Sequence, residues 1–422
     1  MADIHPHKRR INIVVLAIVL AIGVFLRIPS ETFAPNGALH SIAALHPQTA
    51  FTQTGFDEGL YQEYVNKLGR FGVSSYPLIV QDFVERQERI KRSILSPLRF
   101  LYIFSGYAWR SIFGCDALQA LHNVAALFSM LTLGLATLFA WRLRGPLWAL
   151  GVAALMAVAP TQIHMSQHAM VDGFFTFWAL LSLWLLWENF QKPRNWTWLV
   201  AYILGLCLLL LTKENAFFVW IAIVALLICN RWLNFGQVTR ELWLATLLGP
   251  LVGVVILTLL AGGIGEVIHT YRYSVAKNYE LQYAILTGDG PWHRYIVDLL
   301  LVSPVVVLLA LGSIFRLDRT KKPELYLTIF ICGSFVVMCN VKYGMNLRYG
   351  NMWDMPLRFL ALSMLVTLTT PLRRYRSTVL VIAVCLICVL ELRQYIILAV
   401  RYPLYELIPM DLLRALRILK FP

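Results

Sequence analysis

The chain has 422 residues, of which 59% are hydrophobic and 14% are charged. Soluble domains are about half apolar and about a quarter charged, so this composition excludes an ordinary soluble protein and indicates a membrane protein. The net charge of +14 does not indicate a nucleic-acid partner. Its Lys and Arg residues lie in short segments between apolar blocks, and no soluble face combines basic with aromatic residues.

Apolar blocks of about 17 to 25 residues recur along the chain, and such a block crosses about 30 Å of hydrocarbon as a helix. They predict an all-α polytopic membrane protein, with a transmembrane domain over residues 1–397 and an amphipathic interfacial tail over residues 398–422. About eleven spans are expected, at residues 11–29, 117–141, 147–163, 170–188, 197–212, 215–230, 241–263, 295–315, 323–340, 356–371 and 377–397.

Basic residues predict the orientation of these spans. Lys8, Arg9 and Arg10 precede the first span, which is too long for the hydrophobic region of a signal peptide. If this end is cytoplasmic, every short basic loop also falls on the cytoplasmic side, as the positive-inside rule requires. We therefore expect a multi-pass protein of the bacterial inner membrane, although an endoplasmic reticulum protein would look similar.

Two long segments, residues 30–116 and 264–294, then lie on the periplasmic or luminal side. The first mixes both signs of charge with Pro, Gly and aromatic residues, so it is expected to form a folded cap with juxtamembrane helices. Thr54 is the candidate N-cap of a helix that runs to Leu68, with Asp57 as its capping partner. Residues 98–114 are expected to form a helix lying in the membrane interface.

The seven cysteines include no CxxC motif and no Cys/His spacing typical of zinc. His164 and His168 have the i, i+4 spacing of some metal ligands, but no acid of the HExxH type accompanies them. We therefore expect no structural disulfide, no metal and no cofactor.

Charged residues at the ends of spans are candidate functional residues, because polar groups at membrane depth are costly. Asp57-Glu58 in TGFDEGLYQEY is the first candidate, although acids in the first turn of a helix also complement its dipole. Asp172, in QIHMSQHAMVDGFF, is the second. Lys213-Glu214 in LLLLTKENAFF is the third, either an exposed ion pair in a hairpin turn or a buried Lys that holds a phosphate.

A fourth candidate group combines two segments rich in Arg and aromatic residues. Its members are Asp289, Trp292, His293 and Arg294, followed by Asn346, Arg348, Tyr349 and Arg358. Arg suits bidentate recognition of phosphate, and Trp and Tyr suit stacking on sugars. The same aromatic residues suit an interfacial belt equally well.

Taken in chain order, these motifs resemble the C-type glycosyltransferase (GT-C) superfamily. The likeness is to bacterial relatives of protein O-mannosyltransferases and of the lipid A aminoarabinose transferase. The matching features are Asp57-Glu58, Pro97 to Gly114, Arg142 to Gly145, AP-x-x-I-x-x-S-x-x-A-x-x-D (Ala159 to Asp172), G-x-x-x-x-x-x-T-K-E (Gly205 to Glu214), Gly290 to Pro304, and Arg348-Tyr349. Beyond about residue 360 nothing matches.

The resemblance implies a bundle of transmembrane helices around an outward-facing cavity, in which a sugar moves from a polyprenyl-phosphate carrier to an acceptor. Asp57 would be the catalytic base, with Glu58 beside it, and the configuration of the sugar would be inverted. Lys213 and Arg348, with His293 or Arg294, would bind the donor phosphate. The residues expected to contact the substrates are Tyr61, His168, Asp172, Glu214, Trp292 and Tyr349.

Other functions stay open on the sequence. A transporter predicts two homologous halves and charges near the membrane midplane, whereas no internal repeat is visible and the polar clusters lie at the ends of spans. A flippase, and a non-catalytic subunit that kept the transferase fold, are further alternatives. The sugar, the acceptor, the length of the carrier and the oligomeric state are open as well.

Overall fold

The computed structural model describes residues 6–90, 94–402 and 404–419, the side chains of residues 6–11 excepted. Within these residues the chain forms helices joined by turns and loops, without a β-strand. The predicted all-α class is therefore confirmed. The side chains of Lys8, Arg9 and Arg10, on which the predicted orientation partly depends, lie outside the described part.

The α-helices are α1 (Pro6–Phe25), α2 (Phe56–Phe71), α3 (Tyr76–Arg89), α4 (Phe100–Phe113), α5 (Ala117–Arg144), α6 (Pro146–Ala157), α7 (Pro160–Ser166), α8 (Val171–Gln191), α9 (Trp196–Thr212), α10 (Ala216–Leu233), α11 (Arg240–Ala261), α12 (Ile264–Glu280), α13 (Gln282–Thr287), α14 (Arg294–Val302), α15 (Pro304–Ile314), α16 (Lys322–Met338), α17 (Asp354–Thr369), α18 (Arg376–Tyr395) and α19 (Met410–Ala415). Shorter 3-10 helices are η1 (Ser30–Phe33), η2 (His40–Leu45), η3 (Val73–Ser75), η4 (Leu347–Trp353) and η5 (Thr370–Tyr375), and η6 (Ile396–Val400) is a π-helical turn.

Each of the eleven predicted spans coincides with one helix or with a broken pair of helices. The pair α6 and α7 is bent by 60°, and Pro160 begins its second helix; α15 likewise begins at Pro304. Proline has no N–H to continue a preceding helix and is favoured in a first turn. Among the described residues, five helical segments are long and apolar enough to cross a membrane unaided, or six if the bent pair is one span. The number of spans stays a prediction.

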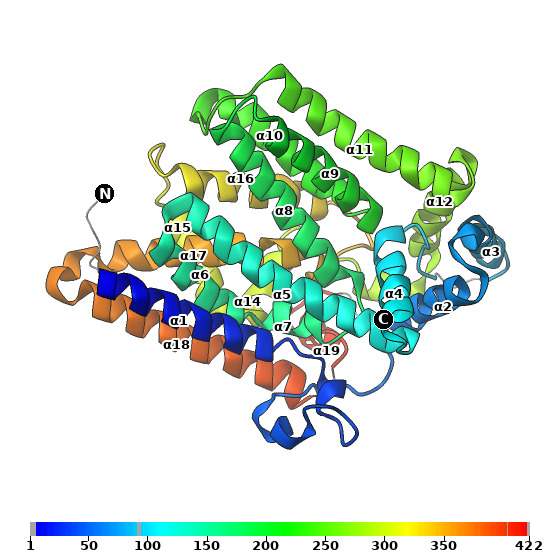
Figure 1. The fold of residues 1–422 in the computed structure, drawn as a ribbon, viewed down its shortest axis with the longest axis horizontal. Coiled ribbons are helices and arrows are strands. Elements are labelled where there is room, and N and C mark those ends of the chain that lie inside the picture. The colour runs from blue at the N-terminus through cyan, green and yellow to red at the C-terminus, as the bar shows by residue number, and fades with distance from the viewer. Residues whose placement is uncertain (1–5, 91–93, 403, 420–422) are drawn as a thin grey trace.

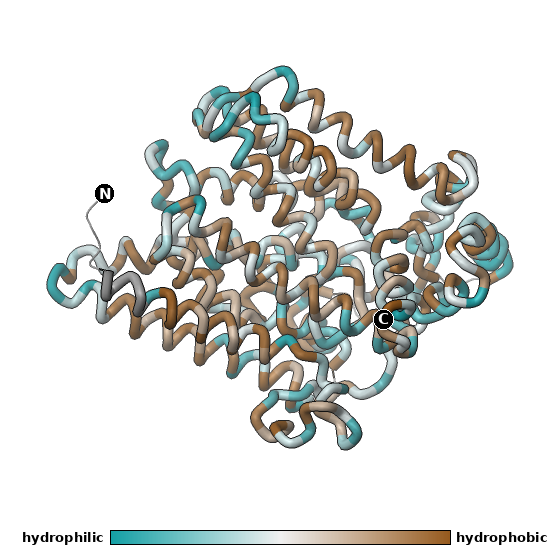
Figure 2. Tube along the Cα trace, in the orientation of Figure 1, coloured by the Kyte–Doolittle hydropathy of each residue, from teal (hydrophilic) through white to brown (hydrophobic). Residues whose placement is uncertain are grey.

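The ends of the bundle differ in character. The turns after α8, α10 and α15 lie at the end where α1 begins, whereas α2, α3 and α12 lie at the opposite end (Figure 1). Figure 2 shows hydrophobic residues along the helices between these ends and many hydrophilic residues on α2 and α3. Basic loops that were predicted to share one side of the membrane are thus at the same end of the molecule.

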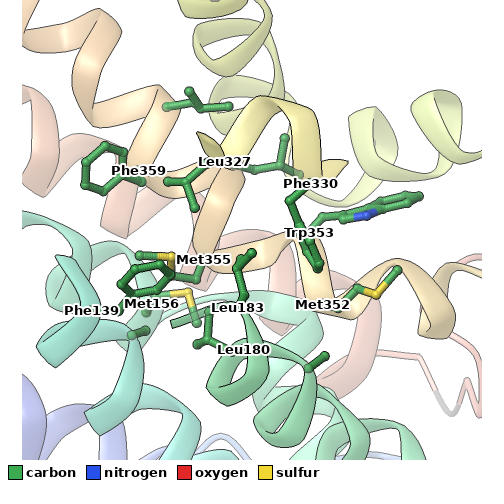
Figure 3. Close-up of a cluster of buried hydrophobic side chains, with 14 of the residues drawn as sticks. Phe139, Met156, Leu180, Leu183, Leu327, Phe330, Met352, Trp353, Met355 and Phe359 are labelled. Atoms are coloured by element: carbon green, nitrogen blue, oxygen red, sulfur yellow. The ribbon is translucent and has the colours of Figure 1, made fainter. Parts of the chain in front are cut away.

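The largest hydrophobic cluster joins α5, α6, α8, α16, η4 and α17. Figure 3 shows its centre, where Phe139, Met156, Leu180, Leu183, Leu327, Phe330, Met352, Trp353, Met355 and Phe359 converge. The Trp353 indole N–H donates to Ser334 Oγ at 2.8 Å, which satisfies a polar group inside the cluster. Helices in a bilayer associate by close packing and such bonds, since lipid is as apolar as the core. The cluster therefore holds η4, with its residues Arg348 and Tyr349 and its N-cap Asn346, in a defined position.

The N-terminal turn of α2 differs from the sequence prediction. The N-cap is Gly55, not Thr54, and the Glu58 carboxylate, not that of Asp57, accepts the Gly55 N–H at 2.6 Å. Glycine is needed there because a Cβ would overlap the ring of Tyr405. The predicted capping arrangement is wrong by one residue. Because Glu58 and not Asp57 caps the helix, the Asp57 carboxylate is available for other contacts.

The C-terminal tail folds back onto the cap. The carbonyl of Ala399, in η6, accepts the Ala50 N–H at 3.0 Å. Leu407, Ile408 and Leu413 are buried. Residues 403 and 420–422 of the predicted tail lie outside the described residues, and its placement in a membrane interface stays a prediction. The burial brings residues 404–409 against the segment that precedes α2.

Candidate active site

Asp57 and Arg348 form the centre of a charged cluster. Asp57 lies in the first turn of α2, and its Oδ2 accepts a hydrogen bond from Arg348 Nη1 at 3.0 Å. Arg348 follows Asn346, whose side-chain oxygen accepts the Arg348 N–H at 2.9 Å and so begins η4. Although 291 residues separate them in sequence, the two predicted residues are brought into direct contact.

Lys213 and Asp172 extend this cluster. Lys213 Nζ lies 2.6 Å from Asp172 Oδ1, and Arg348 Nη1 lies 3.9 Å from Asp172 Oδ2. The ammonium group also lies 4.0 Å from the centre of the Tyr349 ring, a cation–π geometry. Burial lowers the pKa of Lys213 below its usual range, although Asp172 opposes that effect. Of the two readings of the Lys-Glu motif, the buried lysine is the one observed.

Arg99 was missed by the sequence analysis. It donates from Nε to Glu214 Oε2 at 3.2 Å and from Nη2 to Oε1, while its Nη1 donates to the Tyr61 hydroxyl at 2.7 Å. Burial raises the pKa of Glu214, but the charges of Arg99 and Lys213 outweigh burial and lower it overall. An arginine directly before an apolar helix is a costly residue, and that signal could have found it.

Glu58 lies beside Asp57 but faces the other way. Its Oε1 accepts the Ala169 N–H at 2.7 Å and contacts His168 Nδ1 at 3.3 Å and His122 Nε2 at 3.4 Å. Burial raises the pKa of Glu58, but the two imidazoles outweigh burial and hold it well below its usual range. The Glu58 carboxylate therefore joins α2, α5 and the segment before α8. His122 is a second residue that the sequence analysis missed.

The fourth predicted group is only partly assembled with the cluster. Arg294 donates to the Asp289 carbonyl at 2.5 Å and its Nε lies 3.6 Å from Asp298 Oδ2. Arg294 and Arg348 nevertheless line one small cavity. Trp292 is 62% exposed and packs edge-on against His293. These contacts give no direct support to His293 and Trp292 as part of the cluster, and their predicted roles stay predictions.

The tail contributes a further carboxylate that the sequence analysis did not consider. Glu406 Oε1 lies 3.2 Å from Arg348 Nε, and the Asn346 side-chain amide donates to the same oxygen at 3.3 Å. Burial raises the pKa of Glu406, although Arg348 opposes this. An isolated acid between apolar residues, in YPLYELIP, was the available signal.

Two larger cavities flank the cluster. An apolar cavity of about 390 Å³ ends at Lys213 and Glu214. Its other lining residues are Leu206, Leu209, Leu210, Ala216, Phe217, Trp220, Pro250 and Tyr271. A polar cleft of about 230 Å³ adjoins Glu58, His122 and His168 on the other side. Among the described residues, no three His, Cys, Asp or Glu side chains are grouped as metal ligands.

Comparison with known proteins gives a family match and a fold. Residues 111–263, less than half of the chain, match the family described as dolichyl-phosphate-mannose-protein mannosyltransferase. No curated protein sequence matches the chain.

Solved structures match over most of the chain. The apo structure of ArnT from Cupriavidus metallidurans is 16% identical with a TM-score of 0.53, over 84% of this chain and 59% of that one. The apo oligosaccharyltransferase of Archaeoglobus fulgidus is 16% identical with a TM-score of 0.60, over 94% and 56%. ArnT bound to undecaprenyl phosphate is 16% identical with a TM-score of 0.50, over 84% and 60%.

This chain thus spans less than two thirds of the length of the solved structures that it matches. At this identity the likeness shows the fold. The resemblance to the GT-C superfamily is confirmed at that level, as a likeness of fold, and so is the predicted all-α bundle with its apolar helices.

Proposed function

We propose that this protein is a glycosyltransferase that moves a sugar from a polyprenyl-phosphate carrier to an acceptor on the periplasmic or luminal side of the membrane. One observation carries the proposal. Asp57 pairs with Arg348, Asp172 lies near both Arg348 and Lys213, and Lys213 also lines an apolar cavity of about 390 Å³. A carboxylate, an anion-binding pair and a lipid-sized apolar cavity are the parts that such a transfer needs.

The apolar cavity suits the isoprenoid tail of the donor. Its lining is aliphatic and aromatic up to Lys213 and Glu214, so a chain of isoprene units would bury apolar surface along it. The phosphate head would then reach Lys213 and Arg348, which offer one point charge and one planar fork of donors. ArnT from Cupriavidus metallidurans has been solved with undecaprenyl phosphate bound, which is why we choose this lipid as the probe.

Asp57 is proposed as the general base. It would accept the proton of an acceptor hydroxyl or amine, whose oxygen or nitrogen then forms a bond to the anomeric carbon. The bond from that carbon to the phosphate oxygen breaks on the opposite face, and its electron pair leaves with the polyprenyl phosphate. The configuration is inverted, and Arg348 and Lys213 stabilise the departing anion by charge and hydrogen bonding.

Glu58 is assigned a positioning role beside Asp57. Its carboxylate accepts the N–H groups of Gly55 and Ala169 and contacts two imidazoles. It therefore fixes the orientation of the first turn of α2. Arg99, which also donates to the Tyr61 hydroxyl, positions the Glu214 carboxylate in a similar way. Asp172 holds Lys213, and Tyr349 covers its ammonium group.

The test is sugar transfer from labelled polyprenyl-phosphate sugars by membranes that contain the wild type or Asp57→Asn. We expect label to leave the carrier with the wild type, and the variant to be slower by about 10²–10⁴-fold, the usual contribution of a positioned base. Asp318→Asn is the matched control, since Asp318 is half-exposed in a loop between α15 and α16. Equal rates for Asp57→Asn and wild type would move the base elsewhere. No transfer from any donor, with folded protein, would favour a transporter or a non-catalytic subunit.

A further inference from the structure

Arg348 is surrounded by more negative charge than the cluster can balance. Its guanidinium contacts Asp57 at 3.0 Å, Glu406 at 3.2 Å and Asp172 at 3.9 Å. Lys213 neutralises Asp172, which leaves two carboxylates for one arginine among the residues that the structure describes. Arg99 adds nothing to this balance, because it is paired with Glu214.

A donor phosphate entering this cluster would add a further negative charge close to these carboxylates. Like charges a few ångströms apart repel strongly where water is scarce. The phosphate therefore binds well only if one carboxylate gives up its place on Arg348.

Glu406 is the carboxylate held least firmly. Asp57 is hydrogen-bonded to Arg348 from a helix, and Asp172 is hydrogen-bonded to Lys213 from another helix. Among the described residues Arg348 Nε has no hydrogen-bond partner, so Glu406 contacts it as an ion pair without hydrogen-bond geometry. The hydrogen bond that Glu406 accepts comes from the neutral amide of Asn346, at 3.3 Å. Glu406 is also carried by a non-helical segment between η6 and α19.

That segment, residues 404–409, is called the strap below. The ring of Tyr405 packs on Gly55, two residues before Asp57, and the Tyr405 carbonyl lies 3.1 Å from His164 Nε2. Within the described part of the chain the buried Tyr405 hydroxyl has no hydrogen-bond partner, so part of the contact is unfavourable. Leu407 and Ile408 are buried and anchor the far end of the strap. The strap can thus lift at Tyr405 and Glu406 without unwinding a helix.

We propose that Glu406 is a gate on the donor-phosphate site. Without donor, the Glu406 carboxylate is paired with Arg348. When the donor binds, its phosphate replaces that carboxylate, and the Tyr405–Glu406 end of the strap moves off Gly55. The inference rests on the proposed function, because it assigns the anion that competes with Glu406. No covalent step is involved.

The first test measures binding, not turnover. The full-length protein in lipid nanodiscs is titrated with undecaprenyl phosphate, and undecaprenol serves as the lipid without the anion. Glu406→Gln removes the competing charge and keeps the side-chain shape, so we expect it to bind undecaprenyl phosphate more tightly, on the order of tenfold. Asp411→Asn is the matched control, because Asp411 lies on the same tail with a side chain 93% exposed, and it should bind like the wild type.

The outcomes separate the two proposals. If wild type binds undecaprenyl phosphate better than undecaprenol, and Glu406→Gln binds it equally or more weakly, the gate is overturned while the proposed function stands. If no variant distinguishes the two lipids, the donor-phosphate site fails and the gate fails with it.

A second measurement needs no variant. Hydrogen exchange of the strap amides in the wild type should become faster when undecaprenyl phosphate is added, because the contacts of Tyr405 and Glu406 are released. Undecaprenol should leave the exchange unchanged. Slower exchange on binding would show that the strap closes over the donor, which contradicts the gate.

Discussion

Two ionic networks with an arginine at the centre lie in different parts of this molecule. Arg358, in α17, contacts Asp354 at 2.7 Å and Glu391 of α18 at 2.6 Å, and all three side chains are at most 4% exposed. Glu391 also accepts from the Ser303 hydroxyl at 2.8 Å. Arg348, in the candidate active site, contacts carboxylates of α2, α8 and the tail, two of which are 15% and 23% exposed.

The two networks differ in their balance of charge and in the elements that carry their carboxylates. The Arg358 network lies close to a second buried guanidinium, Arg27, which is hydrogen-bonded to the carbonyls of Met156 and Ala157. Arg358 thus pairs with two carboxylates while a second cation lies nearby, and helices carry both carboxylates. The Arg348 network has excess carboxylate and one partner on a loop. The first network is fixed between helices, whereas the second has the excess carboxylate on which the proposed exchange with an anion rests.

Arg358→Leu is expected to have the largest effect on stability. It leaves Asp354 and Glu391 buried without their cation, so the free energy of unfolding should fall by about 3–5 kcal/mol. Arg348→Leu is the matched variant, and its loss should be clearly smaller, because two of the three carboxylates there are partly exposed and Lys213 still pairs with the third. Chemical or thermal unfolding in detergent measures both. Equal losses for the two variants would remove the distinction between the networks.

Glu58→Gln tests the group that joins the active-site turn to the rest of the fold. Losing a charged acceptor of two backbone N–H groups should lower the free energy of unfolding by about 2–3 kcal/mol at neutral pH. Burial raises the pKa of Glu58, but the two imidazoles have the larger, opposite effect. The pKa of Glu58 in the folded state is therefore lower than in the unfolded state. Its contribution is therefore present above the unfolded pKa of about 4.3 and is lost as pH falls below that value.

Unfolding curves recorded from neutral pH down to about pH 3 check this expectation. The wild type should lose stability more steeply on acidification than Glu58→Gln, which has no carboxylate to protonate at this position. Parallel pH profiles for the two proteins would contradict it. The same variant should retain part of its transferase activity, in contrast to Asp57→Asn, because Glu58 acts on the position of Asp57.

The smallest effect on the free energy of unfolding is expected for an exposed ionic network. Lys67 of α2 lies 2.6 Å from Asp82 of α3 and 3.0 Å from Glu63, with side chains 26% to 47% exposed. Lys67→Met should change the free energy of unfolding by less than about 1 kcal/mol, since solvent screens such pairs. Denaturation at low and high salt measures it. A loss as large as that of Arg358→Leu would show that exposure does not separate these networks.

Much of the candidate site could be predicted because its members interrupt apolar sequence. Asp172 and Lys213 each stand out at the end of a span, where a charge needs a reason. Asp57 and Arg348 lie in predicted outer segments and were singled out as part of motifs. Arg358 stood out equally in the sequence, yet it belongs to the buried Arg358 network and not to the candidate active site. Sequence can mark a costly charge, but the identity of its partner depends on helix packing.

The residues that were missed share a physical cause. Arg99, His122 and Glu406 lie in segments that read as a juxtamembrane helix, an ordinary span and an amphipathic tail. Their roles arise from contacts over long sequence separations, such as the 115 residues between Arg99 and Glu214. Periodicity and capping patterns describe neighbours within a few residues and carry no information on such pairs.

The sequence by itself determined the all-α membrane class, the positions of the apolar helices and most of the charged residues of the candidate site. These follow from local rules, since an apolar block of this length crosses the hydrocarbon as a helix and an unpaired charge there is costly. Only the tertiary structure decided that Glu58 caps α2 and that Asp57 is free to meet Arg348. It also decided that the tail returns to place Glu406 on that arginine. Those outcomes depend on which helices pack together, and packing is a property of the whole chain.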